Sequence, residues 1–289
     1  MKKNLILMAA AGLAVFMITA CSSNQSSTQS QPLDTKSEMQ SGASDSKNTA
    51  DDKSDAKGDT SDAGSLQTVK KGKLIMATNA EFPPYEFHEG DDIVGIDAEI
   101  AGEIAKKLGL ELEIEDVAFS AVIPEVISGK ADMVMAGMSV TEERKQNVDF
   151  SKTYADTVQV IIVKDNSDIA KPEHLEKKTI GVQEGTTGAI LAEDVKDANI
   201  ESYNKGVDAV QSLIQNKVDA VIIDEETAKA LIKDTSGIKI LDTAFAKEEY
   251  AIAVKKGNKE LLTQIDKALA ELESEGKIKE IVKKYIKAE

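Results

Sequence analysis

Residues 131–144 read ADMVMAGMSVTEER, and KQNVDFS follows at 145–151. The apolar run 133–136 predicts a short buried strand. Thr141 opens a polar stretch and is expected to cap a helix at 141–146, with Arg144 one turn into it. A buried strand that leads through a Gly-containing turn into a helix is typical of α/β folds, so this stretch decides the fold class.

Short apolar runs alternate with helical stretches on both sides of this segment. Strands are expected at 73–77, 112–116, 133–136, 158–163, 179–182, 218–223 and 250–254. Helices are expected at 97–108, 121–128, 141–146, 188–195, 207–215, 225–232, 259–273 and 278–286, with Asp97 as the N-cap of the first. This alternation predicts an α/β architecture with mostly parallel sheets flanked by helices.

The segment GKADMV at 129–134 is echoed by NKVDAV at 216–221. Each segment reads as a helix end, a turn and a strand, and the strands run out at 136–137 and at 223–224. In open α/β sheets, ligands bind beyond the carboxyl ends of strands. The echo suggests two similar lobes that each offer a strand end to one cleft; chance similarity over six positions is the alternative.

The N-terminus has the layout of an export signal. Residues 1–3 are MKK, residues 5–18 are almost wholly apolar but short for a membrane span, and ITAC follows at 18–21. An export signal that ends at the chain's single Cys resembles a bacterial lipobox. That resemblance implies removal of residues 1–20 and acylation of Cys21, with chains such as palmitate holding the protein on a membrane. An ordinary signal peptide with an incidental Cys is the alternative.

Composition separates residues 22–65 from the rest and excludes several classes of protein. Twelve of these 44 residues are Ser and none is aromatic, so a flexible tether is expected over 21–65. The whole chain carries a formal net charge of −16, which argues against a nucleic acid partner. Two His and one Cys leave little material for a metal site, and neither a metal nor a cofactor is expected.

Three segments together resemble the polar amino acid family of type II periplasmic binding proteins, the solute receptors of ABC importers. They are ATNAEFPPYEF at 77–87 with VGID at 94–97, the stretch 131–151, and GVQEGTTG at 181–188 with VDAVIID at 218–224. The resemblance covers about residues 66–286. It implies a two-lobed clamp, with lobe 1 at 66–157 plus 251–289, lobe 2 at 158–250, and two extended crossings acting as hinges.

Each charged candidate has a physical reading beside the one that the resemblance implies. An Arg offers a planar fork that matches a carboxylate, although Arg144 could equally form a salt bridge with Glu142 or Glu143. The resemblance assigns Arg144 to the ligand α-carboxylate, assisted by Gly137, Ser139 and Thr187. Asp224 reads as an N-cap, and the resemblance makes it, with Gly137, the partner of the ligand ammonium. Thr187 could also be an ordinary helix cap.

The ligand side chain is expected to meet Asn79, Glu81, Phe82, Phe119, Met138 and Gln183. As isolated residues, Phe82 and Phe119 would be core, and Glu81 could point to solvent. Relatives that bind an amide or a cationic side chain often carry Asp where this chain has Asn79. These departures leave polar and basic amino acids as alternatives.

The expected protein is therefore a monomeric, lipid-anchored extracytoplasmic receptor that passes a free L-amino acid to the permease subunits of an ABC transporter. It is not expected to be an enzyme, since no catalytic dyad or triad is apparent in the sequence. Two rival functions stay open. Some relatives of the fold are cyclohexadienyl dehydratases, and a surface adhesin would carry the same export signal and anchor.

Overall fold

The computed structural model describes residues 66–286. The predicted signal peptide, Cys21 and the predicted tether lie outside the described residues. A nine-stranded sheet in the order β5-β1-β6-β12-β7-β10-β8-β9, with β11 beside β7, forms the framework of the described part. Its strands are β1 Lys73–Thr78, β5 Glu111–Asp116, β6 Met133–Val134, β7 Val148–Lys164, β8 Thr179–Gln183, β9 Asn199–Tyr203, β10 Ala220–Asp224, β11 Ile238–Ile240 and β12 Ala246–Lys255.

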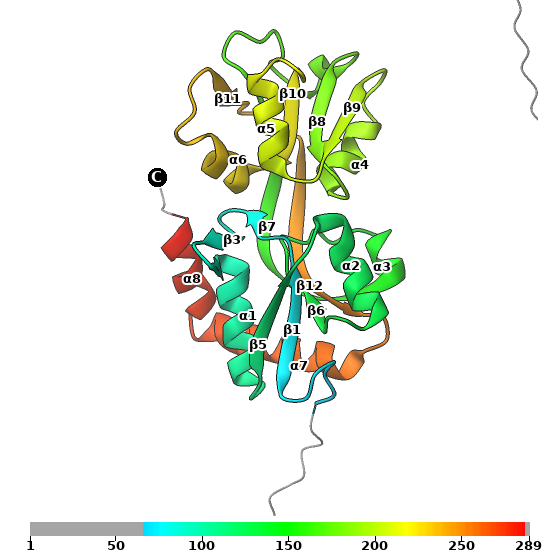
Figure 1. Ribbon diagram of the computed structural model, residues 1–289, viewed down its shortest axis with the longest axis vertical. Helices are drawn as coiled ribbons and strands as arrows, with labels where there is room; N and C mark the ends of the chain where they lie inside the picture. Colours follow the sequence, from blue (N-terminus) through cyan, green and yellow to red (C-terminus); the bar gives the residue numbers. More distant parts are fainter. Residues whose placement is uncertain (1–65, 287–289) are drawn as a thin grey trace, which may run out of the picture. The chain divides into compact units, whose positions relative to one another are not determined.

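Helices flank this sheet in two groups (Figure 1). The first lobe carries α1 Ile96–Lys107, α2 Phe119–Ser128, α3 Arg144–Asn147, α7 Lys259–Ser274 and α8 Lys277–Tyr285, and the second carries α4 Thr187–Glu193, α5 Gly206–Ile214 and α6 Glu225–Ile232. Within each lobe the outer strand pairs are parallel: β1 with β5 and β6, and β8 with β9 and β10. The predicted two-lobed α/β fold is confirmed. The expectation of mostly parallel sheets was wrong, because the pairings β6–β12, β12–β7, β7–β10 and β7–β11 are antiparallel and equal the parallel pairings of this sheet in number.

Each lobe buries both faces of its part of the sheet. In β1, Leu74 and Met76 belong to one core cluster, whereas Ile75 and Ala77 belong to the cluster on the opposite face. The second lobe repeats this arrangement on β10, where Val221 and Ile223 face α5 and α6 while Ala220 and Ile222 face the other core. Burial on both faces explains why these strands appear as continuous apolar runs in the sequence rather than as alternating patterns.

Strands β7 and β12 connect the two lobes (Figure 1). They pair with each other in antiparallel fashion from Ala246↔Gln159 to Lys255↔Val148, with register shifts on either side of Ala251. At their ends β12 pairs with β6 of the first lobe, and β7 pairs with β10 of the second. The sequence predicted only the apolar portions of these strands, 158–163 and 250–254. The polar portions were missed because they lie between the lobes, where burial does not demand apolar residues.

The echoed segments adopt the same structure. Gly129 and Asn216 end α2 and α5 with φ of 76° and 60°, in the left-handed region. The next Asp then exchanges two hydrogen bonds with a parallel neighbour strand: Asp132 with Ile75 in β1, and Asp219 with Thr179 in β8. The similarity at 129–134 and 216–221 is therefore a repeated structural unit and not chance.

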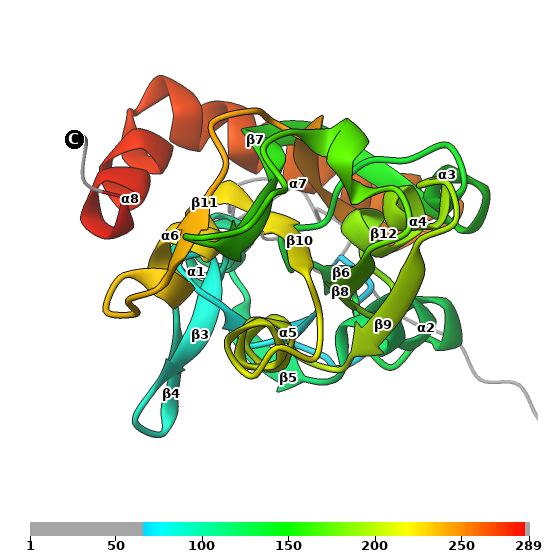
Figure 2. The same ribbon diagram turned by 90° about the horizontal axis from the view of Figure 1, so that it is seen from above.

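Several local expectations differ from the structure. Helix α1 begins at Ile96 with Gly95 as its N-cap, so the prediction that Asp97 caps it was wrong; Asp97 is fully buried in its first turn. Strands β9 and β11 were not predicted, nor was the antiparallel sheet of β2 Glu81–Phe82, β3 Glu86–Glu89 and β4 Asp92–Val94. Figure 2 shows the β3–β4 hairpin extending away from the neighbouring helices. These strands are short and rich in polar residues, so no apolar run marked them.

Candidate functional site

Side chains from both lobes and from the crossing strands line one cavity. It is lined by Phe82, Phe119, Gly137, Ser139, Arg144, Gln159, Gln183, Thr186, Thr187, Ile222, Ile223, Asp224 and Tyr250. The cavity lies beyond the carboxyl ends of β6 and β10, the two strand ends that follow the echoed segments. This is the position at which α/β sheets bind ligands.

Arg144 contributes the positive charge of the cavity. The residue is 8% exposed, and its guanidinium donates to the carbonyls of Ser139 (2.7 Å) and Gly185 (3.0 Å), the second of which belongs to the other lobe. It also lies over the Phe119 ring, 5.6 Å from the centroid. Burial lowers the pKa of Arg144 below its usual value, and the carboxylate of Glu248 opposes this shift. Two carbonyls use only part of the five-donor fork, so donors remain for an anion.

The local chain around Arg144 follows the sequence only in part. The hydroxyl of Thr141 accepts a hydrogen bond from the Arg144 N–H (3.1 Å), but α3 begins three residues later than expected and its N-cap is Glu143, so the prediction that Thr141 caps this helix was wrong. The alternative salt bridge with Glu142 or Glu143 is not observed within residues 66–286. Glu142 pairs instead with Lys145.

Ser139 and Thr187 bring two hydroxyls from opposite lobes close together. Their oxygens lie 3.4 Å apart, and both residues are buried. Thr186, not Thr187, is the side-chain cap of α4: its hydroxyl accepts from the Ala189 N–H. The Thr187 hydroxyl is therefore not used as a cap and is directed into the cavity beside Ser139.

Gly137 has a different role from the one expected for the carboxylate. Its N–H donates to Asp97 Oδ2 (2.8 Å), so it is not available to a ligand carboxylate. That part of the prediction is corrected, and only the carbonyl of Gly137 stays open for an ammonium. Gly137 has φ of 51°, and a Cβ there would lie 2.8 Å from the Phe82 ring. A glycine is needed at this position for both reasons.

Asp97 belongs to a buried acidic pair behind Gly137. It also accepts a hydrogen bond from Tyr154 Oη (2.8 Å), and its carboxyl lies against that of Glu86. Both residues are fully buried, and no other described residue reaches the carboxyl oxygens of Glu86. Burial and the neighbouring carboxylate raise the pKa of Glu86 well above its usual value. This environment therefore favours the neutral form of Glu86 over its carboxylate.

Asp224 contributes the negative charge of the cavity. It is 1% exposed and caps α6, as predicted, with Oδ1 accepting from the N–H groups of Glu226 and Thr227. Its Oδ2 accepts from the hydroxyls of Thr157 and Tyr250, both on the crossing strands. Burial raises the pKa of Asp224, while these donors act in the opposite direction. The two hydroxyls can rotate, which would free Oδ2 for an ammonium group.

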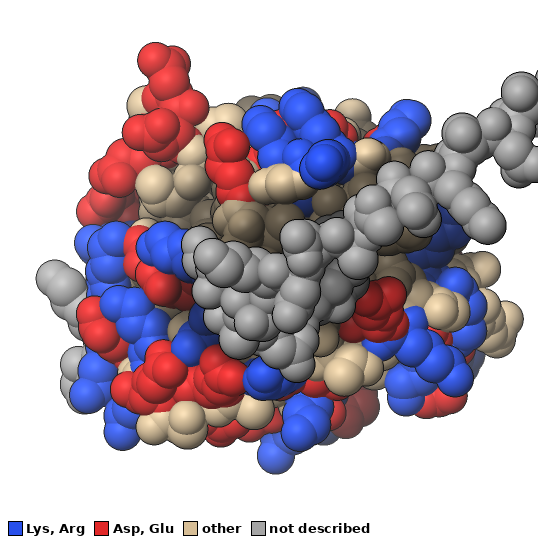
Figure 3. Space-filling view, turned by 90° about the horizontal axis from the view of Figure 1, so that it is seen from below, with Lys and Arg blue, Asp and Glu red and all other residues tan. Residues whose placement is uncertain are grey.

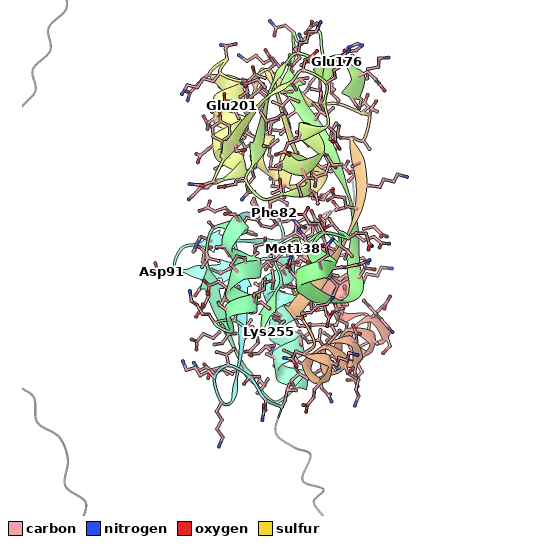
Figure 4. The ribbon with its side chains drawn as sticks, turned by 90° about the vertical axis from the view of Figure 1, so that its right-hand side faces the viewer. Phe82, Asp91, Met138, Glu176, Glu201 and Lys255 are labelled. Atoms are coloured by element: carbon pink, nitrogen blue, oxygen red, sulfur yellow. The ribbon has the colours of Figure 1, made fainter. Side chains whose placement is uncertain are left out.

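Aromatic and amide side chains form the remaining wall. Figure 4 shows Phe82 where the two lobes meet, and Phe119 lines the same cavity. Gln183 of β8 donates to Asn79 Oδ1 (2.9 Å) across the two lobes, so Asn79 reaches the site only through Gln183. Of the other residues expected to meet the ligand side chain, Glu81 forms an ion pair with Lys205, and Met138 packs into the core of the first lobe.

The sequence interpretation missed Gln159, Thr186, Ile222, Ile223 and Tyr250. Gln159 and Tyr250 lie on β7 and β12, which come beside the cavity only through pairing between distant segments. Ile222 and Ile223 lie within a strand whose apolar run indicated only core. A signal was present for Tyr250, since it is an aromatic residue at the start of a predicted strand.

Metal binding and membrane crossing find no support in residues 66–286. This part of the chain has no group of three or more potential metal-ligating His, Cys, Asp or Glu side chains, and no helix long and apolar enough to cross a membrane. On the visible part of the face shown in Figure 3, acidic and basic side chains are intermixed.

Comparisons with known proteins agree with this architecture. Residues 74–288 match the model of the bacterial extracellular solute-binding proteins, family 3. The arginine-binding extracellular protein ArtP of Bacillus subtilis is 37% identical over 76% of this chain and 88% of its own length. An ancestral arginine-binding protein solved with arginine is 40% identical, with a TM-score of 0.72 over 75% of this chain and 99% of its own. An ancestral arginine-binding protein solved with glutamine is also 40% identical, with a TM-score of 0.71 over 76% of this chain and 100% of its own.

The chain belongs to the bacterial extracellular solute-binding proteins of family 3. The resemblance seen in the sequence to receptors of ABC importers is confirmed at the level of family and fold. ArtP and the ancestral protein solved with arginine are both named as arginine-binding proteins.

Proposed function

We propose that this protein binds a free polar or basic L-amino acid in the cavity and delivers it to the permease of an ABC importer. The observation that carries the proposal is the presence of one buried guanidinium, Arg144, and one buried carboxylate, Asp224, on opposite lobes of the same cavity. An amino acid zwitterion carries the two complementary charges. Both buried charges would gain a partner when such a ligand is bound.

The two ends of the zwitterion have distinct sites in this proposal. The α-carboxylate meets the guanidinium of Arg144 and the groups of Ser139 and Thr187. The ammonium meets Asp224 and the Gly137 carbonyl. Because the carboxylate site is mostly on the first lobe and Asp224 is on the second, only the closed arrangement makes both sets of contacts. Ligand binding would thereby favour closure, and the closed form would dock on the permease.

The lobe limits and the anchor are further parts of the proposal. Lobe 1 comprises residues 66–157 and 251–289, and lobe 2 comprises 158–250, so that the changes of lobe fall within β7 and β12. Cleavage before Cys21 and acylation of that residue would hold the protein, as a monomer, on the outer side of the cell membrane. Export is supported by the extracellular relatives, and the anchor by the lipobox-like sequence.

The ligand side chain would lie between Phe82 and Phe119, with Gln183 and Asn79 at its polar end. Both aromatic rings suit the apolar stem of a long side chain, and the amide pair can donate or accept hydrogen bonds. Glu81 is already paired with Lys205, so it is not a free anion for a cationic ligand. Arginine and glutamine are the first candidates, since ancestral arginine-binding proteins similar to this chain were solved with arginine and with glutamine.

A thermal-shift screen tests this function. The protein from residue 21 onward, with Cys21→Ser to prevent acylation, would be refolded free of ligand and mixed with each of the common L-amino acids. At a hundredfold excess over Kd, a ligand specific for the native state stabilises it by about 2.7 kcal/mol, which gives a clear shift. The proposal predicts a shift with arginine, glutamine or another polar member and none with the matching D-amino acid. No shift with any amino acid would refute it.

A further inference from the structure

Glu248 is a carboxylate of the crossing strand β12 that reaches the donors of the cavity. Its Oε2 accepts a hydrogen bond from Ser139 Oγ (2.6 Å) and another from Gln159 Nε2 (3.1 Å). Ser139 and Gln159 are both buried and both line the cavity, whereas Glu248 itself is half-buried and lies outside the lining. The carboxylate of Glu248 is therefore hydrogen-bonded to Ser139, the residue that is expected to bind the α-carboxylate of the ligand.

The hydrogen bond to Glu248 limits what Ser139 can offer to a ligand. A hydroxyl can donate one hydrogen bond, and in this structure Ser139 donates it to Glu248. Toward Thr187, 3.4 Å away, Ser139 Oγ can then act only as an acceptor. The carbonyl of the same residue accepts from Arg144, and the negative charge of Glu248 acts on that guanidinium as well. Glu248 thus already accepts a hydrogen bond, that of Ser139, which the proposed carboxylate site would otherwise offer to the ligand.

We propose that Glu248 is an internal competitor of the ligand α-carboxylate. The carboxylate of Glu248 accepts the hydrogen bond of the Ser139 hydroxyl and attracts the guanidinium of Arg144. A bound amino acid has to displace this carboxylate before its own carboxylate can make the same interactions. This inference rests on the proposed function, because it concerns the same carboxylate site. Its consequence is a lower affinity and an easier release than Arg144 and Ser139 would give alone, which suits a receptor that must hand its ligand on.

The surroundings provide a place for the displaced carboxylate. Glu248 also lines two depressions outside the cavity lining, and the larger of them carries both lysines and carboxylates: Lys145, Lys247, Asp156, Glu225 and Glu249. A rotation of the side chain would carry the carboxylate from the buried Ser139 into this open, hydrated depression. Ligand binding would then exchange one partner of Ser139 for another without leaving a buried charge unpaired.

The test compares Glu248→Gln with Glu249→Gln in the protein from residue 21 onward. Both variants remove one negative charge from β12, but Glu249 is exposed and has no side-chain hydrogen bond in the described residues. With L-arginine and L-glutamine as calorimetric probes, Glu248→Gln should lower the Kd of the bound probe about tenfold, equivalent to about 1.4 kcal/mol. Glu249→Gln should leave it unchanged. An unchanged or higher Kd in Glu248→Gln would overturn the proposal.

A second measurement needs no ligand and separates this inference from the proposed function. A double-mutant cycle of Glu248→Gln and Arg144→Gln, measured by urea unfolding of the ligand-free protein, should show that the two residues stabilise each other. Additive effects would contradict a competing carboxylate, whatever the ligand. If wild type binds neither probe but the cycle shows coupling, the choice of ligand is wrong while the role of Glu248 in opposing Arg144 holds.

Discussion

The two lobes use the same turn to deliver opposite charges. In each, a helix ends in a left-handed residue, an Asp bonds to the neighbouring parallel strand, and a short strand runs to the cavity. Beyond β10 the second lobe presents Asp224 at once, as the cap of α6. Beyond β6 the first lobe inserts a longer segment before Arg144. The same structural unit thus places the carboxylate of Asp224 on the second lobe's side of the cavity. With a longer following segment, it places the guanidinium of Arg144 on the first lobe's side.

This difference teaches how a symmetric framework can recognise an asymmetric ligand. The repeated turns fix where both strand ends lie, and the residues that follow decide the sign of the charge. The binding function therefore depends on the segments after the strands, whereas stability depends on the turns before them. The predictions below test these two dependences separately, beginning with the largest effect.

Removing the cation should have the largest effect. Arg144→Gln leaves the ligand carboxylate without its charged partner, and we expect binding of the amino acid found in the screen to weaken by about 2–5 kcal/mol, measured by calorimetry. Lys145→Gln removes the same charge from the adjacent exposed residue and should change little. Equal losses in the two variants would show that only the general field is involved.

Removing the anion should separate binding from capping. Asn is also a good N-cap, so Asp224→Asn should leave the free energy of unfolding within about 1 kcal/mol of wild type. Loss of the buried charge should nevertheless weaken ligand binding by about 2–4 kcal/mol. Glu225→Gln is the matched neighbour. A variant that unfolds readily yet binds normally would assign Asp224 to structure alone.

The two turn carboxylates should differ in their contributions to stability. Asp132 is buried and accepts from Val69 N and Ile75 N on separate oxygens, so Asp132→Asn turns an amide NH₂ toward one of these donors. We expect a loss of about 2–3 kcal/mol in urea unfolding. Asp219→Asn keeps its one bond, to Thr179 N, through Oδ1 and should cost about 0.5 kcal/mol or less. Equal losses would remove the distinction.

The buried acidic pair should give the first lobe its own pH dependence. Because the pKa of Glu86 is raised in the folded state, its contribution to stability is complete below its usual pKa and declines as pH rises toward the folded value. Stability should fall by up to about 1.4 kcal/mol per pH unit in that range. Glu86→Gln carries no proton to lose, so its unfolding curves should flatten from pH 5 to 9. A slope equal to that of wild type would contradict a raised pKa of Glu86 in the folded protein.

The sequence predicted the parts of the site that follow strand ends. Asp224 could be found because it comes directly after an apolar run that had to be a buried strand. Ser139 and Arg144 follow such a run after a turn, and their roles came from the family resemblance. Gln159 and Glu248 could not be found, because the register between β7 and β12 brings them to the cavity from far along the chain. The expectation for Met138 failed for a related reason. The Met138 side chain packs into the core of the first lobe. The alternation of side chains that assigns faces in a strand does not apply to the turn in which Met138 lies.

A crystal structure of the protein with the amino acid identified in the screen tests the central claim most directly. The account predicts one ligand with its α-carboxylate on the guanidinium of Arg144 and its ammonium on Asp224, and with Glu248 turned away from Ser139. A ligand bound in the reverse orientation, or outside the cavity between Arg144 and Asp224, would contradict it.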